Sequence, residues 1–196
     1  MPASGPRRSE TRPERVVWQG DAWQLKAVAT RLADGRLVEK GLVDHPGSAV
    51  IVPLAAGRVL ALRQYRLSLE QTIFELPAGT RRPGESWLAC AGRELREETG
   101  YRAAEWAELG FIWPSPGLSN EVMALFLARR LTPAPLPADP DEAISLAWLG
   151  LGELARQALN GRLADAKSAL AVLRAAAALR RPERITWSKG MEADNG

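Results

Sequence analysis

Apolar residues follow the two-residue period of strands over much of the chain and the helical period in three places. Strands are predicted where short apolar or alternating runs lie between turn residues, at 16–18, 23–30, 37–44, 49–54, 59–63, 74–76, 109–113, 122–128 and 144–149. Helices are predicted at 86–99, 152–160 and 164–181, each followed by a glycine or proline stop signal. The order of strands, helix, strands and helices predicts an α+β fold with a mixed sheet between helices.

The two ends of the chain differ from its middle. Residues 1–13 are rich in Pro, Ser and Arg without periodicity, which predicts a disordered basic tail. Residues 14–45 are predicted to form a small antiparallel β unit. Three short strands are too few to stand alone, so we expect them to pack on the main domain or on a second copy. Residues 46–184 are predicted to be the main domain, and 185–196 a frayed C-terminal tail.

Composition and charge narrow the class of protein. With 196 residues and 46% hydrophobic content, the chain predicts a folded single domain with an appendage. The net charge is +3, and residues 1–15, with four Arg and two Glu, account for +2 of it. The rest of the chain is nearly balanced in charge, so the sequence shows no basic stripe that would predict a nucleic-acid partner. The sequence contains no run of about 18 consecutive apolar residues, so no membrane span is predicted. A single cysteine, Cys90, favours a reducing compartment, and we expect a cytoplasmic protein.

Acidic residues cluster in residues 79–101, GTRRPGESWLACAGRELREETGY. Glu94, Glu97 and Glu98 stand at i, i+3 and i+4, so they share one face of the predicted helix, and Glu85 stands at its start. Like charges at this spacing destabilise a helix, and a hard divalent cation such as Mg²⁺ would compensate. The alternative is a solvated acidic face that Arg93 and Arg96 partly neutralise.

The spacing of this segment resembles the signature of the Nudix hydrolases: Gly, five residues, Glu, seven residues, then Arg-Glu-apolar-any-Glu-Glu-any-Gly-apolar. The resemblance implies an α/β/α sandwich, hydrolysis of a nucleoside diphosphate linked to another moiety, and two or more Mg²⁺ or Mn²⁺ ions. It implies that Glu94 and Glu98 are metal ligands with Glu97 close by. It also implies that Arg93 pairs with a carboxylate of the segment and that Gly79 lets the loop backbone approach the metal.

Further segments resemble one subgroup, the ADP-ribose pyrophosphatases: His45-Pro46-Gly47, Arg63-Gln64-Tyr65-Arg66, Glu75-Leu76-Pro77-Ala78-Gly79, Ser115-Pro116-Gly117, residues 141–144 and Asp165-Ala166-Lys167. This resemblance implies cleavage of ADP-ribose to AMP and ribose 5-phosphate. It further implies the Ala78 carbonyl as a metal ligand, Arg66 as a substrate contact, and Glu142 as the catalytic glutamate, with Glu121 as the alternative. An arginine suits a pyrophosphate because its guanidinium binds phosphate oxygens bidentately.

Other features leave the substrate open. Lys40-Gly41 stands where the subgroup often carries an Arg-Glu pair that helps to hold adenine, so a GDP-sugar or a dinucleoside polyphosphate is an alternative substrate. A non-hydrolytic ligand sensor is a further alternative. Arg63, Lys40 and Trp23 are additional substrate-binding candidates, and Trp23 can either stack a base or belong to an interface. The subgroup exchanges its N-terminal strands in a homodimer, so the resemblance also implies a homodimer.

Overall fold

The computed structural model describes residues 14–137 and 144–190, which form two compact units. Among the described residues, the smaller unit comprises 14–46 together with 115–121, and the larger comprises 47–114, 122–137 and 144–190. The tail predicted at 1–13 and residues 191–196 lie outside the described residues. No helix among the described residues is long and apolar enough to cross a bilayer. The cytoplasmic location stays a prediction.

The smaller unit is a three-stranded antiparallel sheet, which confirms the predicted N-terminal β unit. Its strands are β1 (Glu14–Gln19), β2 (Gln24–Arg31) and β3 (Leu37–Asp44), in that order. A hairpin turn lies between β2 and β3, where Gly35 has φ 86° and the Asp34 carboxylate accepts the Arg36 amide at 3.0 Å. The segment 115–121 is held to the end of β3, since Val43 donates its amide to the Leu118 carbonyl at 2.9 Å.

The larger unit has, within the described residues, a mixed sheet of eight strands. The main path runs β10-β5-β4-β9-β8-β11, with β6 paired to β5 and β7 to β4. The pair β4–β9 is parallel and the other pairs are antiparallel. The strands are β4 (Ser48–Ala55), β5 (Arg58–Arg66), β6 (Gln71–Glu75), β7 (Ala78–Thr80), β8 (Tyr101–Ile112), β9 (Met123–Pro133), β10 (Ile144–Gly150) and β11 (Ser188–Lys189).

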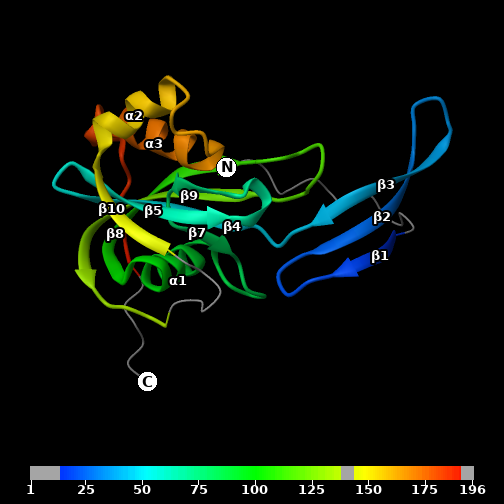
Figure 1. Ribbon diagram of the computed structural model, residues 1–196, viewed down its shortest axis with the longest axis horizontal. Coiled ribbons are helices and arrows are strands. Elements are labelled where there is room, and N and C mark those ends of the chain that lie inside the picture. The colour runs from blue at the N-terminus through cyan, green and yellow to red at the C-terminus, as the bar shows by residue number, and fades with distance from the viewer. Residues whose placement is uncertain (1–13, 138–143, 191–196) are drawn as a thin grey trace. The chain divides into compact units, whose positions relative to one another are not determined.

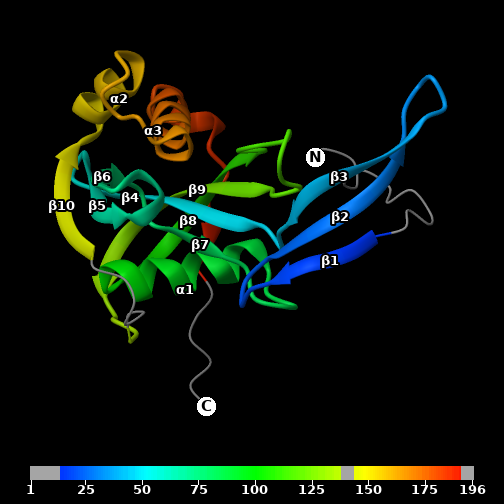
Figure 2. The same ribbon diagram turned by 45° about the vertical axis from the view of Figure 1, so that its right-hand side comes forward.

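Helices cover both faces of this sheet, with α1 (Trp87–Thr99) on one and α2 (Leu151–Leu159) with α3 (Ala166–Leu179) on the other (Figure 1; Figure 2). The central strand β4 shows why helices pack on both faces of the sheet. Successive side chains of a strand point to opposite faces, so Val50 and Val52 pack with α2 and α3, whereas Ala49 and Ile51 pack with α1. The apolar run therefore builds the predicted α/β/α sandwich. Two short 3₁₀ helices, η1 (Leu67–Leu69) and η2 (Pro182–Arg184), complete the elements.

Strand β8 is longer than the sequence predicts. The segment 101–108, YRAAEWAE, is rich in Ala and Glu and has no strand pattern of its own, yet it pairs with β9 along its length. Ala103, Trp106 and Ala107 are buried there. A bulge between Glu108 and Gly110 shifts the register, which interrupts the alternation that sequence analysis relies on.

The prediction of a frayed tail from residue 185 is wrong for residues 185–190. Ile185 and Trp187 pack against the core beneath α3, and β11 pairs with β8 opposite Glu105 and Trp106. The guanidinium of Arg129 lies 3.7 Å from the centre of the Trp187 ring. This segment is short and mostly polar, so nothing local predicts the pairing.

Candidate active site

Helix α1 presents its acidic face because its other face is buried and both of its ends are capped. Ser86 accepts the Ala89 amide at 3.1 Å, and Gly100, with φ 75°, ends the helix in the left-handed conformation. Cys90, Ala91 and Leu95 are fully buried against the sheet. The sequence predicts this helix and its end before Gly100, and the structure confirms both.

Arg93 lies at the centre of the acidic face and contacts three carboxylates. Its Nε and Nη2 atoms donate to the two oxygens of Glu85 at 2.9 and 3.0 Å. Its Nη1 donates to Glu94 at 2.5 Å and to Glu97 at 2.8 Å. Nη2 also donates to the backbone carbonyl of Thr80 at 3.0 Å. One guanidinium therefore joins the loop before the helix, the helix itself and strand β7.

Glu94 and Glu98, both predicted metal ligands, lie against the backbone of β7. Glu98 accepts the amide of Ala78 at 2.9 Å. The Glu94 carboxyl packs on Gly79, where a β-carbon would lie 2.0 Å from Glu94 Cδ and 2.1 Å from its Oε1. Position 79 therefore requires glycine to make room for the Glu94 carboxylate. The structure thus brings Ala78, Glu94 and Glu98 together at one place.

The acidic face is partly buried, and its charges shift one another's pKa. Burial alone would raise the pKa of Glu85, but hydrogen bonds from Arg93 and from the Arg82 amide hold it below its ordinary value. Burial likewise opposes the charge of Arg93, and its carboxylate partners outweigh this and raise its pKa. Burial, with Glu85 and Glu94 nearby, raises the pKa of the Cys90 thiol to about 12. Cys90 is therefore a neutral thiol.

The donor set fits a hard divalent cation held jointly with substrate. Four carboxylates, those of Glu85, Glu94, Glu97 and Glu98, face two guanidiniums, Arg93 and the exposed Arg82, which lies 3.2 Å from Glu97. The site keeps an excess of negative charge and offers only oxygen donors. Within the described residues no three or more His, Cys, Asp or Glu side chains are arranged to hold a metal ion by themselves. Mg²⁺ does not need such a set, since it is typically bound through one or two carboxylates plus substrate phosphates.

Two predicted substrate contacts lie in the larger unit. Arg66 ends β5 and makes a bidentate ion pair with Glu75, at 2.5 and 2.8 Å. Arg63 is exposed, and its guanidinium lies 5.5 Å from the centre of the Phe74 ring. Both arginines therefore lie where β5 pairs with β6.

Three predicted residues lie in the smaller unit. Trp23 packs on Trp18 with ring centres 4.6 Å apart, and both rings remain exposed by more than a third. Lys40 is exposed on β3. Glu121 lies 3.7 Å from His45, in the segment that is held to β3. Glu142, the predicted catalytic glutamate, lies outside the described residues.

Sequence reasoning missed the partners of these groups. Nothing local predicts that Arg82 reaches Glu97, or that Lys167 and Glu75, separated by 92 positions, form an ion pair. The resemblance to the subgroup includes both Glu75 and Lys167. It does not indicate that they touch.

Known proteins resemble this chain in sequence and in fold. Residues 44–171 match the family model of the NUDIX domain. The ADP-ribose pyrophosphatase of Bacillus subtilis (strain 168) is 31% identical over 83% of this chain and 90% of its own length. The ADP-ribose pyrophosphatase of Mycobacterium tuberculosis is 32% identical over 84% of this chain and 81% of its own. A crystal structure of an ADP compounds hydrolase superposes with a TM-score of 0.76 at 21% identity, over 89% of this chain and 96% of that one, which shows the shared fold.

Proposed function

The chain belongs to the NUDIX domain family of hydrolases, and from that premise we propose that it cleaves the pyrophosphate bond of a nucleoside diphosphate derivative. The substrate we propose first is ADP-ribose, giving AMP and ribose 5-phosphate. The observation that carries the proposal is the gathering of Glu94, Glu98 and the Ala78–Gly79 backbone beside Arg93. Two relatives named as ADP-ribose pyrophosphatases support the choice of substrate.

In the proposed mechanism, Glu94, Glu98 and the Ala78 carbonyl hold Mg²⁺ or Mn²⁺, two or more ions per site, with Glu97 close by. When bound, the metal supplies charge neutralisation at the pyrophosphate and a lowered pKa for its water. Arg93 holds Glu85, Glu94 and Glu97 close together on one face, which orients these carboxylates.

The remaining predicted residues bind substrate or handle the attacking water. Arg66 binds a phosphate group, because a guanidinium fork matches phosphate oxygens. Glu142 orients or deprotonates the attacking water, with Glu121 as the alternative. Arg63, Lys40 and Trp23 stay candidate substrate contacts.

A panel of nucleoside diphosphate derivatives, incubated with Mg²⁺ in ¹⁸O-labelled water, tests this function. The expected products from ADP-ribose are AMP and ribose 5-phosphate, one of which carries the label. Glu98→Gln keeps the shape of the side chain and removes its charge, so kcat should fall by about a hundredfold or more. Glu108→Gln makes the same change at an exposed glutamate of β8 and should leave kcat unchanged. Near-normal kcat in Glu98→Gln would contradict the metal assignment.

A second substrate class has specific support. Lys40-Gly41 replaces the pair that helps to hold adenine in the resembling subgroup. A relative at 29% identity is named as a CMP-phosphonate hydrolase, and one at 28% as an ADP compounds hydrolase. A higher kcat/KM for a GDP-sugar or a dinucleoside polyphosphate than for ADP-ribose would select this alternative.

We also propose that the chain forms a homodimer through exchange of its N-terminal strands. Strand β1 is exposed along its whole length, with Val16, Val17 and Trp18 each about half exposed. Val17→Asp should therefore shift the protein towards the monomer in sedimentation experiments. Leu67→Asp, at an 80% exposed leucine of the larger unit, is the control and should leave the mass unchanged. A monomeric wild type would contradict this proposal.

A further inference from the structure

Arg66 is held by a buried carboxylate that is itself held by a lysine. Glu75, at the end of β6, is only 2% exposed, and both of its oxygens are engaged by Arg66. The ammonium group of Lys167 forms an ion pair with the same carboxylate. The Arg66 side chain is 37% exposed, so part of it lies at the surface while its Nε–Nη2 edge is fixed.

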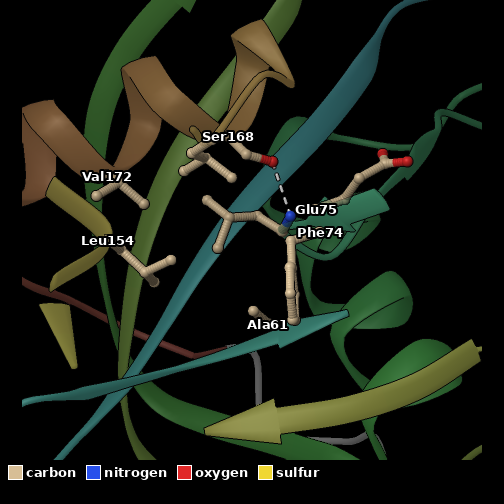
Figure 3. Close-up of a pocket in the computed structure, with 8 residues that line it drawn as sticks. Ala61, Phe74, Glu75, Leu154, Ser168 and Val172 are labelled. Atoms are coloured by element: carbon tan, nitrogen blue, oxygen red, sulfur yellow. Dashed lines mark hydrogen bonds between the residues drawn. The ribbon is translucent and has the colours of Figure 1, made fainter. Parts of the chain in front are cut away.

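The first turn of α3 fixes Lys167 in turn. Asp165 caps the helix by accepting the Ser168 amide at 3.2 Å, and its carboxylate also accepts from Lys167 at 2.9 Å. Ser168 accepts the Leu76 amide at 2.7 Å, which ties α3 to the backbone directly after β6 (Figure 3). Figure 3 shows Ser168 reaching from α3 to this point, among Val172, Leu154 and Ala61. The chain Asp165–Lys167–Glu75–Arg66 is thus tied to the first turn of α3, and α3 is tied to the backbone after β6.

Lys167 also sets the charge near Arg66. The four named groups carry two negative and two positive charges, so their own charges balance. Without Lys167 they would carry one net negative charge next to the proposed phosphate contact. Like charges placed together inside a protein are costly, and such a cluster would repel an anionic substrate.

We propose that Glu75 and Lys167 are positioning residues that hold Arg66 ready to bind a substrate phosphate. An arginine loses rotamer freedom when it binds, and a partner that orders it beforehand removes that cost from the binding step. The inference rests on the proposed role of Arg66 in substrate binding. It assigns to Glu75 and Lys167 an effect on affinity that acts through Arg66.

A double-mutant cycle with ADP-ribose tests the proposal. The variants are Glu75→Gln, Arg66→Ala and the double variant. The measurements are Kd in EDTA, where the metal is removed, and KM and kcat with Mg²⁺. Glu75→Gln and Arg66→Ala should each weaken Kd by about tenfold, as expected for a charge-assisted phosphate contact. The double variant should bind no more weakly than Arg66→Ala, and kcat of Glu75→Gln should stay within about threefold of the wild type.

Two further variants separate positioning from folding. Lys167→Met should raise KM as Glu75→Gln does, and Lys167→Arg should restore it, so the test survives if Glu75→Gln fails to fold. Glu105→Gln is the matched control, because Glu105 also pairs with two arginines, Arg129 and Arg130, away from β5. It should cost stability and leave KM unchanged.

The outcomes distinguish this inference from the proposed function. Additive losses in the cycle, or losses of stability and kcat with unchanged Kd, would overturn the positioning role. An unchanged Kd in Arg66→Ala would remove Arg66 from the substrate site and overturn the inference as well. Hydrolysis of the panel by the wild type would still stand in both cases, whereas its failure would refute the proposed function itself.

Discussion

Replacing Gly79 by alanine should disable the site while leaving the fold nearly intact. A β-carbon at position 79 would lie 2.0 Å from Glu94 Cδ and 2.1 Å from its Oε1, whereas ordinary contacts begin near 3.4 Å. The carboxyl must therefore move by more than 1 Å, roughly the difference between these distances. The atoms in the way belong to the end of a flexible side chain, so the backbone of β7 need not shift.

This displacement has a calculable effect on stability and on metal activation. Glu94 would lose its 2.5 Å hydrogen bond with Arg93, both partners being almost buried, so unfolding free energy should fall by about 1–3 kcal/mol. Glu94 is also a proposed metal ligand. The Mg²⁺ concentration for half-maximal activity should therefore rise by about 10- to 100-fold, as is typical when a metal ligand is misoriented.

The assay pairs urea unfolding with Mg²⁺ titration of hydrolysis, and Gly92 provides the control. A β-carbon at position 92 of α1 would meet no atom within 4 Å. Gly92→Ala should therefore stabilise the protein by about 0.5–1 kcal/mol through helix propensity alone, with unchanged activity. Wild-type metal activation in Gly79→Ala would refute the placement of Glu94 at the metal.

Three further predictions follow from the same region. Cys90, the only cysteine, has a pKa near 12, so it should not react with a thiol reagent at pH 8 until the protein is unfolded, and rapid reaction of the native protein would contradict its burial. Folding lowers the pKa of Glu75 and of Glu85 below the ordinary value of 4.5, so both carboxylates stabilise the protein at pH values above 4.5. That stability is lost as the pH falls below it, and urea unfolding should show a shallower loss in Glu85→Gln. EDTA should abolish hydrolysis without unfolding the protein in circular dichroism, because Arg93 already satisfies three carboxylates; unfolding by EDTA would show that the metal holds the site together.

Local signals explain how much of the fold the sequence predicts. Helix α1 was accessible to prediction because its cap at Ser86, its stop at Gly100 and its buried apolar face all lie within one segment. The first half of β8 cannot be predicted from its own residues, because Ala and Glu are uncommon in strands. Only its pairing with β9 makes this segment a strand. The pairing of β11 with β8 is likewise a contact between distant segments.

The same distinction separates the residues of the site from their contacts. Spacing along one helix predicts that Glu94, Glu97 and Glu98 share a face. It cannot predict that Gly79 is needed to accommodate Glu94, because that contact joins two elements. The Arg66–Glu75 pair depends on the register of β5 and β6, and Lys167 reaches it only through the packing of α3.

Arg93 explains how Glu85, Glu94 and Glu97 can cluster before any ion binds. It holds Glu85, Glu94 and Glu97 together, so a cation that takes Glu94 must compete with a guanidinium hydrogen bond. That competition weakens metal binding to the protein alone. A diphosphate brings additional negative charge and its own oxygen ligands, which shifts the balance towards the cation. The metal and the substrate should therefore bind cooperatively, since each supplies charge or ligands that the other requires.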